Sequence, residues 1–260
     1  MTGTSGRVLL AILLGTIALF PRPSSGQIGP ILPSIDPEID CVEVVPDSLS
    51  VNGVTDPGAM ITLRVRILLD GVSQSRAQQI VTQARTSYDS LGINLTPTYQ
   101  SVSFSGNDAL AIIQQARSMF GGTRPSGVDL VHVLTSKDIE IDGDDTVAGL
   151  ADCIGGVRFG NRAFSVSEVE PLYPTGSENL PLGPLTLYAN VSAKLAAHEM
   201  GHLLGGHHHY ANCIEGAPSA AALEPGPCTL MFNVADFVSP NFSTLNGAIV
   251  RGHSVLYAAP

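Results

Sequence analysis

The first half of the chain alternates between short strand-like segments and longer helix-like segments. The strand-like segments are rich in aliphatic and β-branched residues, and in the helix-like segments apolar residues recur every three or four positions. In order, the predicted elements are strand 60–69, helix 73–90, strand 93–104 (interrupted by Pro97), helix 108–120 (N-capped by Asn107) and strand 128–134. This order predicts an α/β fold with a mostly parallel sheet flanked by helices.

The second half of the chain is less regular. Two more strands are expected at 146–154 and 163–169, followed by a loop rich in Pro and Gly at 171–184. A helix is predicted from Val191 or Ser192 to Leu204, with an apolar side made of Leu195, Ala196, Met200, Leu203 and Leu204. After an irregular segment at 211–227, a final helix is predicted at 243–257, with Leu245, Ile249, Val250 and Leu256 as its apolar set.

The first 26 residues have the pattern of a secretory signal peptide. Arg7 provides a positive charge, residues 8–20 form a largely apolar run, and Ser24-Ser25-Gly26 supplies small residues before a cut at Gln27. The run is short for a membrane span, so an uncleaved anchor is the weaker alternative. Residues 27–58 are rich in Pro, Gly and Ser and are expected to form an extended lead-in, which leaves residues 59–260 as one domain.

Composition narrows the choice of partners. The hydrophobic content of 44% is sufficient for a core, and the formal net charge is −10. So acidic a chain disfavours nucleic acid and anionic membranes as partners. Beyond the first 26 residues no apolar run is long enough to span a bilayer, so we expect no stable membrane insertion.

One stretch of the sequence carries the candidate chemistry. Residues 198–208 read HEMGHLLGGHH, which fits the pattern H-E-x-x-H-x-x-G-x-x-H. On a helix, residues four apart lie on one face, so His198 and His202 can bind one metal ion. Gly205 is suited to end the helix in the left-handed conformation, after which the chain can bring in His208. Catalytic Zn²⁺ bound by three protein ligands keeps one position for water, and Glu199 can take a proton from that water.

Simpler interpretations exist for parts of this motif. An H-E-x-x-H alone occurs by chance, and a lone histidine on an apolar face is usually a core residue, but the longer pattern fixes five positions. Among the consecutive His207, His208 and His209, only His208 has the required spacing, although a neighbour could take its place. The sequence therefore predicts one catalytic zinc ion, with His198, His202 and His208 as its ligands.

The motif and its surroundings resemble the metzincin zinc metallopeptidases, and among these the reprolysin (adamalysin-like) family. That family carries H-E-M-G-H-x-L-G-x-x-H, and its second signature, a methionine turn, is similar to CTLMF at 228–232. Residues 134–139, 146–156 and 163–169 are similar to the family's strands before the active-site helix, so the resemblance covers about residues 60–257. Two details differ: His209 stands where the family usually has Asp, and the methionine turn is one residue longer.

The resemblance implies a metzincin-like catalytic domain. Its mostly parallel, twisted sheet would have an antiparallel edge strand, here at 146–154, which could pair with an extended peptide substrate. A long active-site helix would be followed by an irregular C-terminal part that holds the methionine turn and the final helix. Met231 would then lie beneath the zinc, and residues 232–237 would line the specificity pocket.

Four cysteines are present, and an even number in an exported chain favours two disulfides. Of the three possible pairings we favour Cys213 with Cys228, because both flank the loop between the third histidine and the methionine turn. Cys41 and Cys153 would form the second disulfide. As an alternative, the thiolate of Cys41 could block the metal, since the lead-in is too short to be the large pro-domain that reprolysins normally have.

We therefore expect a secreted, monomeric zinc endopeptidase that acts on protein or peptide substrates with Glu199 as general base. Two alternatives remain open at this point. The same fold could serve as a catalytically inactive metal-binding or adhesion protein, although a retained Glu199 argues against this. A structural zinc site would need a fourth protein ligand, for which His207 and His209 are the candidates.

Overall fold

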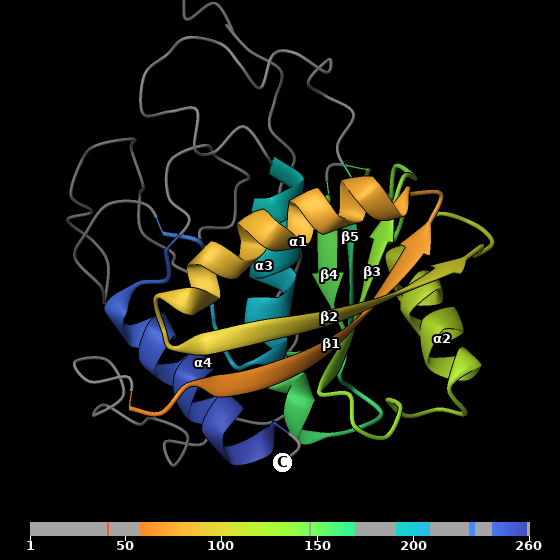
Figure 1. Ribbon diagram of the computed structural model, residues 1–260. Helices are drawn as coiled ribbons and strands as arrows, with labels where there is room; N and C mark the ends of the chain where they lie inside the picture. The colour runs from red at the N-terminus through yellow and green to blue at the C-terminus, as the bar shows by residue number, and fades with distance from the viewer. Residues whose placement is uncertain are drawn as a thin grey trace, which may run out of the picture. The chain divides into compact units, whose positions relative to one another are not determined.

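A five-stranded sheet forms the centre of the computed structural model (Figure 1). The structure describes Cys41 and residues 58–145, 147–169, 191–208, 229–231 and 241–258, all of which belong to one unit, residues 32–260. The strand order is β2-β1-β3-β5-β4, in which only β4 runs antiparallel to its neighbour. The strands are β1 (Ile61–Asp70), β2 (Ile93–Val102), β3 (Leu130–Thr135), β4 (Gly149–Ala151) and β5 (Phe164–Glu168).

Helices cover both faces of this sheet (Figure 1). On one face, α1 and α3 share a hydrophobic core with β1, β2 and β3; on the other, α2 packs against β3 and β5. The helices are α1 (Gln74–Asp89), α2 (Ala109–Met119), α3 (Val191–Leu203) and α4 (Thr244–Tyr257), with a short 3-10 helix η3 (Gly156–Arg158). Every residue of β3 and β5 is buried, as expected for central strands with helices on both sides. The predicted α/β class and mostly parallel sheet are confirmed.

The predicted interruption at Pro97 is wrong, because β2 runs unbroken from Ile93 to Val102. Proline lacks a backbone N–H and therefore weakens a central strand, but it is tolerated at a sheet edge. β2 is at the end of the strand order and pairs only with β1 among the described strands. Pro97 therefore lies where a missing donor costs little.

The N-cap of α2 is Asp108 and not the predicted Asn107. The Asp108 carboxylate accepts a hydrogen bond from the backbone N–H of Ala111 at 2.6 Å. The Asn107 side chain instead donates to the carbonyl of Asp138 at 3.3 Å. Both residue types are good caps, and tertiary contact with the 138–140 segment selects between them.

The final helix has the predicted extent but not the predicted buried face. Ser243 caps α4, and its Oγ accepts from the N–H of Asn246 at 3.1 Å. Ile249 and Val250 are buried, whereas Leu245 and Leu256 are 45% and 53% exposed. The buried face of α4 is largely polar or small, with Asn246, Gly247, Arg251, His253 and Ser254. This face makes specific hydrogen bonds in place of apolar contacts, which hydrophobic periodicity cannot detect.

Several predicted features lie outside the described residues. They are the signal sequence at 1–26, the lead-in apart from Cys41 and Gly58, the loop at 171–184, the segment at 211–227 with Cys213, Cys228 at its end, and the pocket wall at 232–237. None of the described helices has the length and apolar character needed to cross a membrane.

Candidate metal centre

Helix α3 carries the first two candidate ligands on its buried side. The apolar residues Leu195, Ala196, Met200 and Leu203 are fully buried, as predicted, and fix the helix against the sheet. His198 and His202 lie one turn apart, at 0% and 1% exposure. The helix ends at Leu203, and Gly205 adopts a φ of +88°, in which a side chain would be strained. The chain can then turn toward His208.

Three imidazole nitrogens converge after this turn. The Nε2 atoms of His198 and His202 are 2.9 Å apart, and Nε2 of His208 lies 3.2 Å from each of them. Tetrahedral zinc with Zn–N bonds of about 2.0–2.1 Å would separate its nitrogens by about 3.3 Å. Since the spacing and donor type both fit, His198, His202 and His208 form a group positioned to bind a single zinc ion.

Backbone carbonyls fix the orientation of two of these rings. Nδ1 of His198 donates to the carbonyl of Leu230 at 2.8 Å, and Nδ1 of His202 donates to the carbonyl of Gly206 at 2.7 Å. A proton on Nδ1 leaves the lone pair on Nε2, the atom that faces the other histidines. Both rings are therefore held as the neutral tautomer that a metal requires.

Met231 packs against the glycines on either side of His202. The residue is fully buried. Its Sδ lies 2.9 Å from the position that a Cβ on Gly201 would occupy, and its Cε lies 3.4 Å from the corresponding position on Gly206. Any larger residue at position 201 would push against Met231, so the close approach of α3 and the segment that carries Met231 depends on Gly201.

Glu199 is directed toward the edge strand. Its side chain is fully buried, and the space where Gly149 of β4 would carry a Cβ is filled by the Glu199 carboxyl group, whose Cδ lies 2.7 Å from that position. Burial raises the pKa of the Tyr88 hydroxyl well above its usual value, and the nearby negative charge of Glu199 raises it further. Tyr88 therefore stays protonated and donates to the carbonyl of Ala197 at 2.6 Å, which ties α1 to α3 beside the first ligand.

Three contributions to this site had no signal in the sequence. Gly149 makes room for Glu199, the Leu230 carbonyl orients His198, and the Asn246 side chain of α4 binds both backbone groups of His207. Each contact joins segments that are far apart in the chain, so no local motif could reveal it. His207 lies outside the metal-binding group, while His209 is outside the described residues.

One of the two predicted disulfides lies within the described residues and is present. Cys41 and Cys153 form a disulfide, and the N–H of Cys41 donates to the carbonyl of Ile154 at 3.4 Å. Gly155, which follows Ile154, donates its N–H to the carbonyl of His202 at 2.8 Å. The lead-in is thereby joined to a loop that contacts the helix bearing two ligands. In this structure Cys41 is therefore not placed as a thiolate on the metal.

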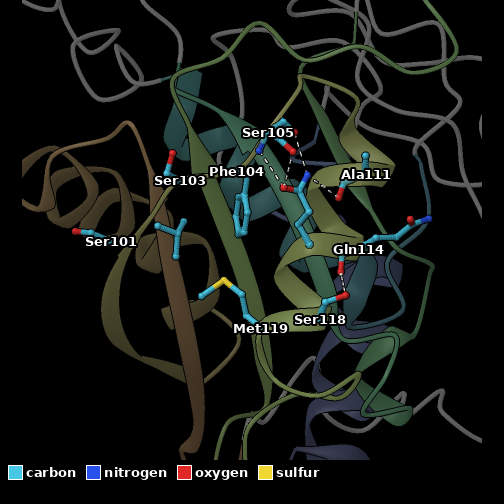
Figure 2. Close-up of a pocket in the computed structure, with 10 residues that line it drawn as sticks. Ser101, Ser103, Phe104, Ser105, Ala111, Gln114, Ser118 and Met119 are labelled. Carbon is cyan, nitrogen blue, oxygen red and sulfur yellow. Dashed lines mark hydrogen bonds between the residues drawn. The ribbon is translucent and has the colours of Figure 1, made fainter.

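A separate groove lies between the end of β2 and α2 (Figure 2). It has a volume of about 730 Å³, and Gln115 within it bonds both the N–H and the carbonyl of Ser105. None of the described residues that line it is titratable; the lining carries hydroxyl, amide, thioether and apolar groups. The groove thus lacks the acid, base or metal ligand that hydrolysis needs.

Comparisons with known proteins agree with the chemistry of the histidine group. The sequence profile described as metallo-peptidase family M12B, reprolysin-like, matches residues 74–209. The crystal structure of archaemetzincin from Methanopyrus kandleri is similar in fold, with a TM-score of 0.51 and 20% sequence identity over 74% of this chain and 95% of that chain. No curated protein matches the sequence. The profile spans more than half of the chain and includes all three histidines, so this protein belongs to the reprolysin-like metallopeptidases of family M12B.

Proposed function

We propose that the protein is a zinc-dependent endopeptidase that hydrolyses peptide bonds with Glu199 as general base. The observation that carries this proposal is the convergence of three Nε2 atoms within 3.2 Å of one another. Two of them belong to a helix that also carries a carboxylate directly after the first ligand. Family membership supports peptidase activity, and protein or peptide substrates follow from it.

The proposed mechanism assigns a separate task to each residue. When bound, Zn²⁺ supplies Lewis-acid chemistry: it polarises a carbonyl oxygen and lowers the pKa of water. His198 and His202 present neutral nitrogens because their Nδ1 protons are held by carbonyls. The Glu199 carboxylate accepts a proton from the attacking water and then delivers it to the leaving amine. We propose a supporting role for Met231, which packs against Gly201 and Gly206 on either side of His202.

We propose that substrate binds along β4. This strand is the antiparallel end of the sheet, and its Gly149 contacts the Glu199 side chain. A peptide that adds to a sheet edge forms main-chain hydrogen bonds over several residues, so its scissile bond need not lie at a chain end. This geometry favours cleavage within a chain.

We also propose that the protein is exported. The signal-like pattern of residues 1–26 supports export, as does the disulfide between Cys41 and Cys153, because disulfides persist mainly in oxidising compartments. Detection of mature protein beginning at Gln27 in the medium of the producing cells tests this; an intact N-terminus retained inside them would contradict it.

The substitution Glu199→Gln tests the mechanism. The amide has nearly the same size but cannot accept the proton, so we expect kcat to fall by at least 100-fold while the variant still binds one zinc ion per chain. The substrate is a quenched fluorescent peptide blocked at both ends, which only an endopeptidase cleaves. The same assay with a chelator and with added zinc measures metal dependence.

Two results would contradict the proposal in different ways. Undiminished hydrolysis by the Glu199→Gln variant would remove Glu199 from the mechanism. A wild-type protein that binds zinc but cleaves neither casein nor blocked peptides would instead indicate an inactive member of the family.

A further inference from the structure

The side chain of Asn246 forms a two-point contact with the residue before the third ligand. Its Oδ1 accepts from the N–H of His207 at 2.9 Å, and its Nδ2 donates to the carbonyl of His207 at 2.9 Å. Asn246 is 4% exposed. One buried amide thus satisfies both backbone groups of a single residue, as a neighbouring β-strand would, and restricts the orientation of the peptide that leads into His208.

Asn246 is itself held in place. It lies in the first turn of α4, where its N–H donates to Oγ of the N-cap Ser243 at 3.1 Å. The carbonyl of Asn241, just before that cap, accepts from the N–H of Leu230 at 2.8 Å. Leu230 in turn orients the His198 ring through its carbonyl. The beginning of α4 is therefore connected to the supports of two of the three ligands.

The segment that carries His208 needs such a constraint. His198 and His202 are fixed by the helix that contains them, but residues 206–208 have no regular secondary structure. Gly205 precedes this segment and Gly206 is its first residue, and glycine loses more conformational freedom on ordering than any other residue. His208 must nevertheless bring Nε2 to within 3.2 Å of both other nitrogens.

We propose that Asn246 is a positioning residue for the zinc site, which sets the place of His208 through the backbone of His207. It is not one of the three ligands, and its side-chain amide binds the backbone of His207. The inference rests on His208 being a zinc ligand, and it does not depend on peptidase activity, because its effect is on metal affinity.

The experiment measures zinc binding to the full chain by competition with a chromophoric chelator. Asn246→Leu removes both hydrogen bonds, and the isosteric Asn246→Asp keeps only the acceptor for the His207 N–H. We expect the zinc dissociation constant to rise by roughly 10- to 100-fold in Asn246→Leu and by a smaller factor in Asn246→Asp, as for other residues that orient ligands from outside the first coordination sphere. In the Co²⁺-substituted protein, the absorption of both variants should shift toward that of His208→Ala.

Arg251→Met is the matched control. Arg251 is also a buried hydrogen-bonding residue of α4, and its guanidinium donates to the carbonyls of Leu91 at 2.7 Å and Ala59 at 3.0 Å, in a different region. This variant should lower the melting temperature of the metal-free protein and leave zinc affinity and the Co²⁺ spectrum unchanged. If Arg251→Met loses as much zinc affinity as Asn246→Leu, the effect comes from the general packing of α4 and not from the contact between Asn246 and His207, and the proposal is wrong.

The outcomes separate this inference from the assignment of the site. Wild-type zinc affinity in folded Asn246→Leu and Asn246→Asp would overturn the positioning role. If Asn246→Leu does not fold, Asn246→Asp decides, by its zinc affinity and Co²⁺ spectrum against the wild type. If His208→Ala binds zinc as tightly as the wild type, the ligand assignment itself is wrong.

Discussion

His132 lies in β3 with no exposed surface, and both of its ring nitrogens face serines of β5. Nδ1 is 2.8 Å from Oγ of Ser165, and Nε2 is 3.0 Å from Oγ of Ser167. Leu130 and Leu134, two residues away on either side, belong to the core beneath α1 and α3, so His132 shares that face. Burial lowers the pKa of His132 to about 3, and the ring is neutral near pH 7.

This depressed pKa makes stability depend on pH in a defined direction. The ring of His132 binds a proton near pH 6.5 in the unfolded chain but only near pH 3 in the folded chain. The stability that the neutral ring gives the folded state is therefore fully present above pH 6.5 and is lost as the pH falls toward 3. We expect the free energy of unfolding to decrease by up to about 1.4 kcal/mol per pH unit from this group between pH 6 and 4. Urea unfolding of metal-free wild type and His132→Gln measures it; equal pH slopes would contradict this prediction.

At the scale of single elements, β4 links the sheet to the proposed chemistry although it spans only Gly149–Ala151. Residues of the opposite face, such as Leu150, pack in the core beneath α2, while Gly149 faces Glu199. The strand thus anchors itself on one side of the sheet and leaves room for the carboxylate on the other.

Gly149→Ala tests this arrangement. The added Cβ would overlap the Glu199 carboxyl group and displace it, so we expect kcat to fall at least tenfold while zinc affinity stays within about twofold. The control is Gly160→Ala, whose Cβ would come nearest to the Thr123 and Arg124 side chains. Steady-state kinetics on a blocked peptide and a zinc titration provide the readouts; unchanged kcat in Gly149→Ala would show that Glu199 does not depend on β4.

Helix and strand periodicity predicted the elements of this fold well, and their interactions less well. The helices and β1 were evident because apolar residues recur in them at helix or strand spacing, and β3 because it is a short, nearly continuous apolar run. The cap of α2 and the buried face of α4 were not, because Asp108 and Asn246 owe their roles to partners that are distant in the chain. The three histidines were predictable since a helical spacing and one glycine turn bring them together.

At the scale of the whole molecule, a zinc ion would add a further link between parts of the chain that already share a hydrophobic core and hydrogen bonds. Its ligands come from α3 and the segment after it, and their supports come from Leu230 and from Asn246 of α4. A ligand that binds only the folded state stabilises it by about 4 kcal/mol at 1,000 times its dissociation constant.

Metal removal should therefore lower the melting temperature of the whole chain. We expect a decrease of about 10 °C on chelation, because 1 kcal/mol corresponds to roughly 2–4 °C in a protein of this size. Differential scanning calorimetry with and without chelator measures the shift, and His202→Ala, which lacks one ligand, should show a much smaller one. Identical melting curves for the wild type in both conditions would show that the bound metal does not stabilise the fold.

The disulfide between Cys41 and Cys153 has a consequence for maturation. A cut before Gln27 would release everything on its N-terminal side, because no cysteine precedes that point. A cut between Cys41 and Gly58 would release nothing: the severed piece would remain covalently attached next to the loop that contacts the metal helix. Processing in that interval would thus produce a two-chain molecule, whose smaller chain leaves only when a thiol reductant is supplied.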